Sequence, residues 1–250
     1  MAGARIERVI LRRAGLRYPF GHDFAERLEG RTVTGVSRRA KYLVAALSSG
    51  EALLMHLGMS GWFHVSRGEP ELGKHDHVIF EMSSGTFIVF NDPRRFGFMK
   101  MMAATDDADA LPDLGPEPLD RRFTPEVLAS ALRGKKTTLK AALLDQRVVA
   151  GLGNIYVSEA LHRARLSPKR RASTLVTPAG GPRPGAVALV EGIRAALTHA
   201  IERRHRAYVT DRFRVYEHEA ERCPRRGCGG TIKRITQGGR STYFCPACQK

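Results

Sequence analysis

The sequence is poor in cysteine, in long apolar runs and in negative charge. Its 250 residues include only four cysteines, and no apolar stretch has the length of a transmembrane helix or the form of a secretion signal. These absences disfavour a membrane-spanning protein and a disulfide-rich secreted scaffold. We therefore expect a cytoplasmic protein whose cysteines stay reduced.

Acidic residues are outnumbered by basic ones. The chain has 25 Asp and Glu against 41 Lys and Arg, which gives a formal charge of +16 and an isoelectric point near 10.4. Such a surplus attracts polyanions, and the planar fork of arginine suits phosphates and base edges. Nucleic acid is the expected partner. An anionic membrane surface is the competing one, but no basic amphipathic helix with aromatic anchors supports it.

The four cysteines form two pairs near the end of the chain. Cys223 and Cys228 lie in CPRRGC, Cys245 and Cys248 lie in CPAC, and sixteen residues separate the pairs. Two such knuckles across a hairpin can bring four thiolates to one tetrahedral Zn²⁺ ion. The zinc would be structural, since four protein ligands leave no open position for catalysis. Two disulfides are the alternative, which a reducing compartment disfavours.

The chain before the cysteines divides into a strand-forming part and a helical part. Residues 31–102 contain short apolar or alternating runs about ten residues apart, which predicts an antiparallel sandwich or barrel. Residues 104–123 are acidic and proline-rich, as in a linker.

Helices are predicted after residue 123. Thr124-Pro125-Glu126 has the N-cap, first-turn proline and first-turn acid of a helix start. Helical spacing continues over 137–147, 153–165 and 185–204. The predicted fold class is therefore α+β.

Seven short strings match one protein family, in the same order along the chain. They are Arg39-Ala40-Lys41-Tyr42-Leu43, His56-Leu57-Gly58-Met59-Ser60-Gly61, Lys74-His75-Asp76-His77, Asn91-Asp92-Pro93-Arg94-Arg95-Phe96-Gly97, Leu114-Gly115-Pro116-Glu117-Pro118-Leu119, Gly151-Leu152-Gly153-Asn154-Ile155-Tyr156 and Gly239-Arg240-Ser241-Thr242. With the zinc knuckles they resemble the formamidopyrimidine-DNA glycosylase and endonuclease VIII family of base-excision repair enzymes, closest to its formamidopyrimidine branch.

The resemblance implies a domain order and a reaction. It implies a β-sandwich domain over 1–103, a linker over 104–123, a helix–two-turns–helix domain over 124–212 and a zinc finger over 213–250. The expected protein is a monomer acting on double-stranded DNA at the bacterial nucleoid. In the implied reaction, an oxidised or ring-opened purine is flipped out of the duplex. An amine then displaces the base, and β- and δ-elimination follow from the Schiff base.

Two residues match catalytic positions of the family. Lys41 matches a lysine thought to donate a proton during β-elimination, a role that desolvation beside other cations makes feasible by lowering the pKa of the amine. Arg240, in the zinc hairpin, matches the arginine implicated in δ-elimination and phosphate binding. Without the resemblance, Lys41 would be interpreted as a surface strand lysine.

Three residues match those that fill the gap left by an everted base. Base flipping costs a few kcal/mol of stacking and pairing. Phe96 as a wedge and Met59 as a plug would recover part of this cost, and Arg94 would hydrogen-bond the orphaned partner base. The alternative interpretation of Phe96 and Met59 is that they are ordinary core residues.

Three further residues match phosphate contacts of the family: His75, Lys135 and Asn154. Asn154 lies between two predicted helices, where backbone N–H groups and its own amide can bind a phosphate. GLGN is only a fragment of a dinucleotide fingerprint and follows helical sequence, so that interpretation is discarded. His75 and His77 have the spacing of metal ligands on a strand, but no further ligand is evident.

At three places the chain departs from the family pattern, and the minor one is the first zinc knuckle, which has four residues between Cys223 and Cys228 where many relatives have two. The family's nucleophile is an N-terminal proline followed by a glutamate, and no residue here matches either one. Ala2, through a free amine, and Lys41 are weak substitutes. The segment between Ile201 and Tyr216 is shorter than its family counterpart, which carries a loop that caps an everted oxidised purine, so recognition of 8-oxoguanine is in doubt.

Three functions remain open. In the first, the start is mis-assigned and the encoded protein is an ordinary bifunctional glycosylase and AP lyase. In the second, the protein binds damaged or abasic DNA without catalysis. In the third, it is a general basic nucleic-acid-binding module that does not distinguish damaged from intact duplex.

Overall fold

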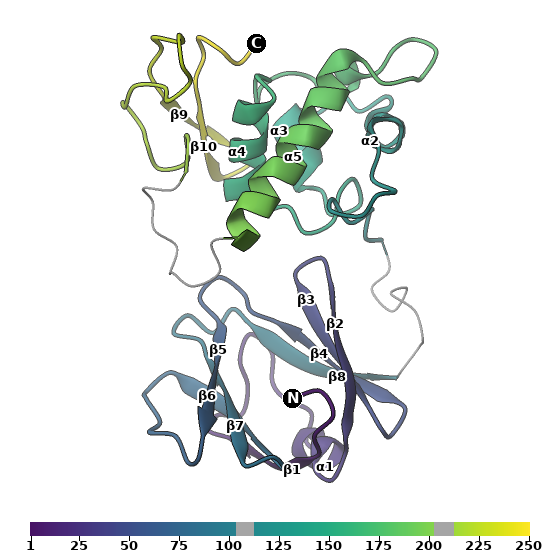
Figure 1. The fold of residues 1–250 in the computed structure, drawn as a ribbon, viewed down its shortest axis with the longest axis vertical. Coiled ribbons are helices and arrows are strands. Elements are labelled where there is room, and N and C mark those ends of the chain that lie inside the picture. The colour runs from purple at the N-terminus through teal and green to yellow at the C-terminus, as the bar shows by residue number, and fades with distance from the viewer. Residues whose placement is uncertain (104–112, 203–212) are drawn as a thin grey trace. The chain divides into compact units, whose positions relative to one another are not determined.

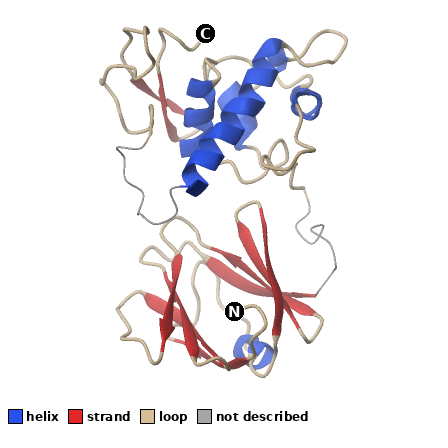
Figure 2. Cartoon of the chain, in the orientation of Figure 1, coloured by secondary structure: helices blue, strands red, loops and turns tan. Residues whose placement is uncertain are grey.

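The computed structural model describes residues 1–103, 113–202 and 213–250. They form two compact units, Met1–Pro112 and Asp113–Lys250 (Figure 1). The first unit is built mainly of strands, and the second combines helices with a hairpin (Figure 2). The predicted α+β fold class is confirmed. None of the described helices is both long and apolar enough to cross a bilayer.

The first unit is a sandwich of two four-stranded antiparallel sheets. One sheet has the order β1-β6-β7-β5 and the other the order β2-β3-β4-β8. The strands are β1 (Ile6–Leu11), β2 (Val33–Arg39), β3 (Tyr42–Leu47), β4 (Glu51–His56), β5 (Trp62–Arg67), β6 (Asp76–Met82), β7 (Thr86–Asn91) and β8 (Phe98–Ala103). Between sandwich and barrel, the structure selects the sandwich.

Alternating side chains of the strands form the core of this unit. Phe80 of β6 and Phe90 of β7 are almost completely buried, and Met55 of β4 belongs to the same cluster. Helix α1 (Phe24–Leu28) adds Phe24 and Leu28 to it. Burial of each large apolar side chain contributes about 2–3 kcal/mol, so this core can hold the two sheets together.

Sequence patterning did not separate every strand. β1 lies before the predicted β region, and a register shift between Ile6 and Arg8 interrupts its alternation. β5 is an edge strand with a mostly exposed or half-exposed sequence. Its Trp62 is half exposed and donates its indole N–H to Asn91 Oδ1 at 3.1 Å. Helix α1 is too short to give a helical repeat.

The second unit contains four α-helices and one 3-10 turn among its described residues. They are α2 (Pro125–Leu132), α3 (Leu139–Leu144), α4 (Asn154–Arg163), η2 (Ala172–Leu175) and α5 (Pro184–Glu202). The predicted cap is confirmed, since the Thr124 hydroxyl accepts a hydrogen bond from the N–H of Val127. α3 is shorter than predicted at both ends: the Thr138 hydroxyl caps its start by accepting from Ala141 N–H, and the backbone becomes extended at Asp145, whose ψ is 112°.

Helices α4 and α5 form the centre of the second unit. They approach so closely at Gly192 that a Cβ atom there would lie 2.8 Å from the carbonyl oxygen of Ala160. Val157, Leu161 and Ile193 are fully buried in the shared core. The last two residues of the helix predicted over 185–204 lie outside the described residues.

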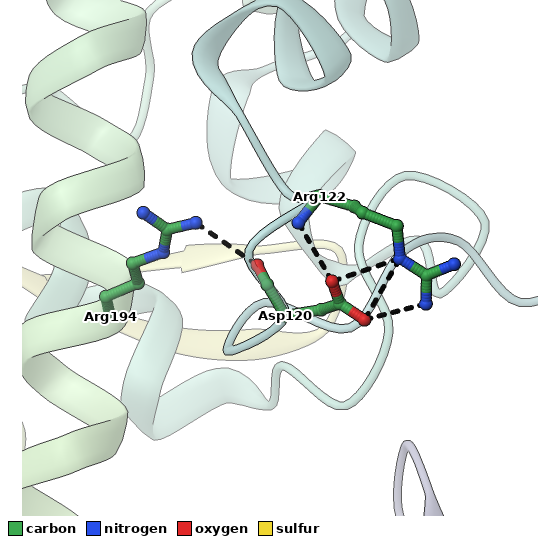
Figure 3. A network of polar contacts seen from close by, with 3 residues as sticks. All are labelled: Asp120, Arg122 and Arg194. Atoms are coloured by element: carbon green, nitrogen blue, oxygen red, sulfur yellow. Dashed lines mark hydrogen bonds and ion pairs between the residues drawn. The ribbon is translucent and has the colours of Figure 1, made fainter.

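The described end of the expected linker, 113–123, packs on the helices. Arg194 of α5 donates to the carbonyl oxygens of Asp120 and Phe123 at 3.1 and 2.7 Å. The Asp120 carboxylate in turn accepts from Arg122, which lowers the pKa of Asp120 to about 2 (Figure 3). The Phe123 side chain is fully buried in the helical core. This stretch is therefore part of the second unit, and the other predicted boundaries stay predictions.

A hairpin completes the chain. β9 (Lys233–Gln237) and β10 (Arg240–Phe244) pair antiparallel around a two-residue turn, Gly238-Gly239. Both glycines have positive φ, at 56° and 70°, a conformation that side-chain-bearing residues rarely adopt. The turn places Arg240 at the exposed tip of the hairpin.

Candidate zinc centre and nucleic-acid interface

The four predicted zinc ligands converge. The Sγ atoms of Cys223, Cys228, Cys245 and Cys248 all lie within 4.8 Å of one another. Two of the pairs are 3.6 and 3.9 Å apart. Zn–S bonds of about 2.3 Å in a tetrahedron require sulfurs about 3.8 Å apart, so the set fits zinc. A disulfide requires about 2 Å, and the cysteines are free, so the disulfide alternative is wrong.

The surroundings of two of the thiols shift their pKa values in opposite directions. Burial raises the pKa of Cys223, whereas a backbone hydrogen bond from Gly230 lowers that of Cys228 to about 7. A bound Zn²⁺ ion would ionise its thiol ligands outright. With four thiolates around it, the ion has a structural role.

The alternative metal site at His75 and His77 is not formed. Across the described residues, the cysteines are the one group of three or more His, Cys, Asp or Glu side chains that could hold a metal ion. His77 is buried, and its Nε2 lies 3.0 Å from the carbonyl oxygen of Asp92. His75 precedes strand β6 and is half-buried.

Strand register brings three predicted segments to one end of a sheet. Tyr42, His56 and Phe98 are paired in a row across β3, β4 and β8. Lys41 immediately precedes this row, loop 57–61 follows it, and loop 92–97 leads into it. Residues far apart in the sequence therefore share one edge of the first unit.

The two loops touch through glycine. A Cβ atom on Gly58 would overlap the backbone of Phe96 and lie 2.5 Å from the nitrogen of Gly97. Gly58 also has a φ of 67°. A Cβ atom on Gly97 would in turn lie 2.8 Å from the carbonyl oxygen of His56. The close approach of the two loops thus requires glycine at both positions.

A buried carboxylate fastens the loops together. Asp92 is fully buried. Its Oδ1 accepts from the Ser60 hydroxyl at 2.6 Å, and its Oδ2 accepts from Gly97 N–H at 2.8 Å. Arg94 N–H donates to the same Ser60 hydroxyl at 3.2 Å. One carboxylate therefore fixes both loops relative to each other.

The large side chains of these loops face solvent. Met59 is 68% exposed and Phe96 is 43% exposed, so neither is a core residue. The Arg94 guanidinium lies 4.8 Å from the centre of the Phe96 ring, within range of a cation–π contact. The fastened loops therefore present two large apolar side chains to solvent, where a partner can contact them.

Lys41 occupies the tip of the β2–β3 hairpin. It is exposed in a two-residue turn with Ala40, whose φ is 52°. The pKa of the nearby His56 is lowered by burial and then by the charges of Lys41 and Arg17. His56 therefore stays neutral at pH 7, and Nδ1 of its ring accepts from Gly58 N–H at 3.0 Å.

The second unit brings Asn154 and Arg240 together. Asn154 is the first residue of α4, and its Nδ2 donates to the carbonyl oxygen of Ser241 at 2.9 Å. The sequence predicts that the Asn154 amide binds phosphate, but its Nδ2 group also holds the hairpin at Ser241, beside Arg240. The N-terminus of α4, where the helix dipole favours negative charge, remains suited to a phosphate.

A buried lysine that the sequence did not reveal supports the same strand. Lys140 of α3 is fully buried. Its Nζ donates to the carbonyl oxygen of Ser241 at 3.0 Å and to the Thr242 hydroxyl at 2.6 Å. Burial, and then repulsion from Arg240, lowers its pKa to about 8. Its partners are about a hundred residues away, so local pattern gave no signal.

The Lys135 side chain is partly buried and lies near a carboxylate. It is half-buried, in the loop between α2 and α3, and its Nζ lies 4.0 Å from Asp145 Oδ2. Asp145 is also bound by Arg147 at 3.0 Å, and this arginine is the main reason that the pKa of Asp145 is lowered. The phosphate role of Lys135 stays a prediction.

A buried glutamate was also missed by sequence reasoning. Glu159 of α4 is 3% exposed. Its carboxylate accepts from the backbone N–H groups of Arg214, Val215 and Tyr216 at 2.9–3.2 Å. It thereby anchors the chain that leads into the zinc finger. Most of the segment expected to be shorter than in the family, 203–212, lies outside the described residues.

Three family models match successive parts of the chain. They are the formamidopyrimidine-DNA glycosylase N-terminal domain over residues 1–99, the H2TH domain of the same enzymes over 114–211, and the zinc finger found in FPG and IleRS over 220–250. A formamidopyrimidine-DNA glycosylase of Rhodopseudomonas palustris (strain BisA53) is 58% identical over 276 residues, covering 100% of this chain and 94% of the relative.

The chain belongs to the formamidopyrimidine-DNA glycosylase family. The corresponding protein of Bradyrhizobium sp. (strain BTAi1) is 54% identical over 276 residues, with the same coverage. Two solved structures of the Lactococcus lactis enzyme, one with DNA containing an abasic site and one with DNA containing FAPY-dG, match with TM-scores of 0.87 and 0.86. They are 29% and 30% identical and are matched over 94% of their length by the whole of this chain. Membership in this family makes the protein a DNA glycosylase and AP lyase with a structural zinc finger.

Proposed function

We propose that this protein binds duplex DNA at an everted nucleotide and removes oxidised or ring-opened purines, as its family does. The observation that carries the proposal is the row formed by Tyr42, His56 and Phe98. This row gathers Lys41 and the two fastened loops at one end of the sheet. Relatives crystallised with abasic-site and FAPY-dG-containing DNA support this substrate class.

The loop side chains suit the gap left by an everted base. In this proposal Phe96 and Met59 enter the stack, while Arg94 hydrogen-bonds the partner base. Each stacked aromatic contact recovers about 1–3 kcal/mol, comparable with the few kcal/mol that flipping costs. The Asp92 anchor limits loop motion, so little conformational entropy is lost when DNA binds.

Phosphate binding is assigned to four residues. Asn154 at the start of α4 and Arg240 at the hairpin tip are joined through Ser241. They would bind phosphates near the lesion, with Arg240 also assisting δ-elimination. His75 and Lys135 are the further proposed phosphate contacts. The zinc ion would hold the knuckles at the base of this hairpin, and no chemical step passes through it.

The nucleophile is the open part of the mechanism. No residue of this sequence matches the family's Pro-Glu pair, and Lys41 is assigned to proton donation during β-elimination. If the coding sequence extends upstream, an in-frame Pro-Glu-Leu-Pro string should precede Met1. A stop codon before any such string would rule out a mis-assigned start as the reason that the Pro-Glu pair has no match.

Catalysis can be tested apart from the binding of damaged DNA, because the proposed DNA-contacting residues would serve a non-catalytic binder equally well. Borohydride trapping on abasic duplex distinguishes the two, because a Schiff base gives a covalent adduct. An adduct rules out pure binding, whereas its absence together with intact lesion preference supports it.

Lesion preference itself is tested with the zinc-loaded chain and two duplexes, one intact and one with a stable abasic analogue. We expect tighter binding of the abasic duplex at matched salt. Phe96→Ala and Met59→Ala should reduce that preference about tenfold each. Val65→Ala, on the edge strand and 67% exposed, is the matched control and should leave it unchanged. Equal affinity of the wild type for both duplexes would refute the proposal and leave a general nucleic-acid-binding module.

A further inference from the structure

A histidine outside the ligand set lies against the zinc centre. His162 is in the last turn of α4 and is fully buried. Its Nε2 lies 3.3 Å from the Sγ atom of Cys223, within the range of an N–H···S hydrogen bond. The four thiolates already complete a tetrahedral set, so the ring is placed beside a ligand and outside the coordination sphere.

The surroundings of the ring select one tautomer. Its Nδ1 atom is buried and has no hydrogen-bond partner among the described residues. A proton on Nδ1 would therefore be an unsatisfied buried donor, and the lone pair of Nε2 would face the lone pairs of a thiolate. A proton on Nε2 instead gives a donor directed at the sulfur and leaves one ring nitrogen, the acceptor Nδ1, without a partner.

The knuckle returns a contact to the same turn of the helix. The guanidinium of Arg225, two residues after Cys223, donates to the carbonyl oxygens of His162 and Arg163. A cation at this end of α4 is favourable because the last carbonyl groups of a helix carry partial negative charge. The helix thus reaches the knuckle through the side chain of His162, and the knuckle reaches the helix through the side chain of Arg225.

We propose that His162 is a positioning residue of the zinc centre, which donates its Nε2–H to the Cys223 thiolate and thereby slows metal loss. A hydrogen bond to a metal-bound thiolate reduces the charge on sulfur and its reactivity toward electrophiles. Loss of such an outer partner typically weakens metal binding about 10–100-fold. This role concerns the metal centre and does not depend on the proposed action on DNA.

The first test uses the unaltered, zinc-loaded chain. Long-range ¹H–¹⁵N correlation of the imidazole nitrogens reports which nitrogen carries the proton. We expect the His162 ring to be the Nε2–H tautomer. A ring protonated on Nδ1 would overturn the proposal, because Nε2 would then have no hydrogen to give to Cys223.

The second test compares two substitutions. His162→Phe keeps a flat ring but removes the donor, and His162→Gln keeps a donor near the position of Nε2. Zinc release is followed with a chromogenic chelator in the presence of a thiol-reactive electrophile. We expect release about 10–100-fold faster from His162→Phe than from the wild type, and within a few-fold of the wild type for His162→Gln.

A packing defect would behave differently. It would speed release in both variants alike, and equal rates for the two would overturn the proposal, as would a wild-type rate for His162→Phe. Cobalt substitution gives a readout that packing does not move. The thiolate-to-metal absorption band should shift in His162→Phe and return toward its wild-type position in His162→Gln. If His162→Phe does not fold, the tautomer measurement still decides the question.

Discussion

Substitution of Lys140 by methionine tests two effects of this buried charge: the stability lost by its burial and the stability gained from its hydrogen bonds to the hairpin. The pKa of Lys140 is lowered from 10.5 to about 8, chiefly by burial. The unfolded chain therefore binds more protons than the folded one between these values, and stability rises as the pH increases through this range. Below pH 8 the charged form costs about 3 kcal/mol relative to a normal lysine. Its two hydrogen bonds to the hairpin return a similar amount.

The expected net effect of Lys140→Met at pH 7 is therefore small, within about 2 kcal/mol of zero. Its pH dependence is diagnostic. Between pH 7 and pH 9.5 the wild type should gain about 2 kcal/mol of unfolding free energy relative to the variant. Weaker DNA binding is also expected, because the strand beside Arg240 loses a support.

Urea unfolding followed by far-UV circular dichroism measures this difference, since four of the five α-helices described lie in the second unit. Lys136→Met is the matched control, because Lys136 is exposed and a few residues away. Its difference from the wild type should not depend on pH. If the difference for Lys140→Met were equally flat from pH 7 to 9.5, the reasoning about the buried charge would be refuted.

Three further perturbations test the loops and the zinc finger. Gly58→Ala should cost more than about 1 kcal/mol by urea unfolding and reduce abasic-site preference, since its Cβ would meet loop 92–97; an unchanged preference would contradict the contact. Asp92→Ala should destabilise the first unit by about 2–4 kcal/mol, because Ser60 and Gly97 lose a buried acceptor; a change under about 0.5 kcal/mol would contradict that anchor. Zinc removal by a chelator should abolish DNA binding through Arg240 while leaving unfolding of the first unit unchanged, and retained lesion binding in the metal-free protein would contradict the role of the hairpin.

The sequence predicted those features whose signal is local. Cysteine spacing predicted the zinc set, and the Thr124-Pro125 pair predicted the start of α2, because each depends on residues close in the chain. The positions of Met59 and Phe96 came from a family resemblance. That they lie at the same end of one sheet follows from strand register, which no local pattern specifies.

The buried polar residues were the part that sequence could not supply. Lys140, Glu159 and Asp92 look like ordinary surface residues in a sequence, where charged side chains are usually exposed. Each is buried in the structure because its partners come from distant or loop segments. Only the folded chain shows that these charges hold the hairpin, the entrance to the zinc finger and the paired loops.

The single tryptophan of the chain gives the first unit an intrinsic optical probe. Trp62 follows loop 57–61 directly, is 51% exposed, and bonds Asn91, the residue before Asp92. Its emission therefore reports on the polarity around both paired loops. Fluorescence quenching during a titration would time the arrival of a ligand at this edge without any attached dye.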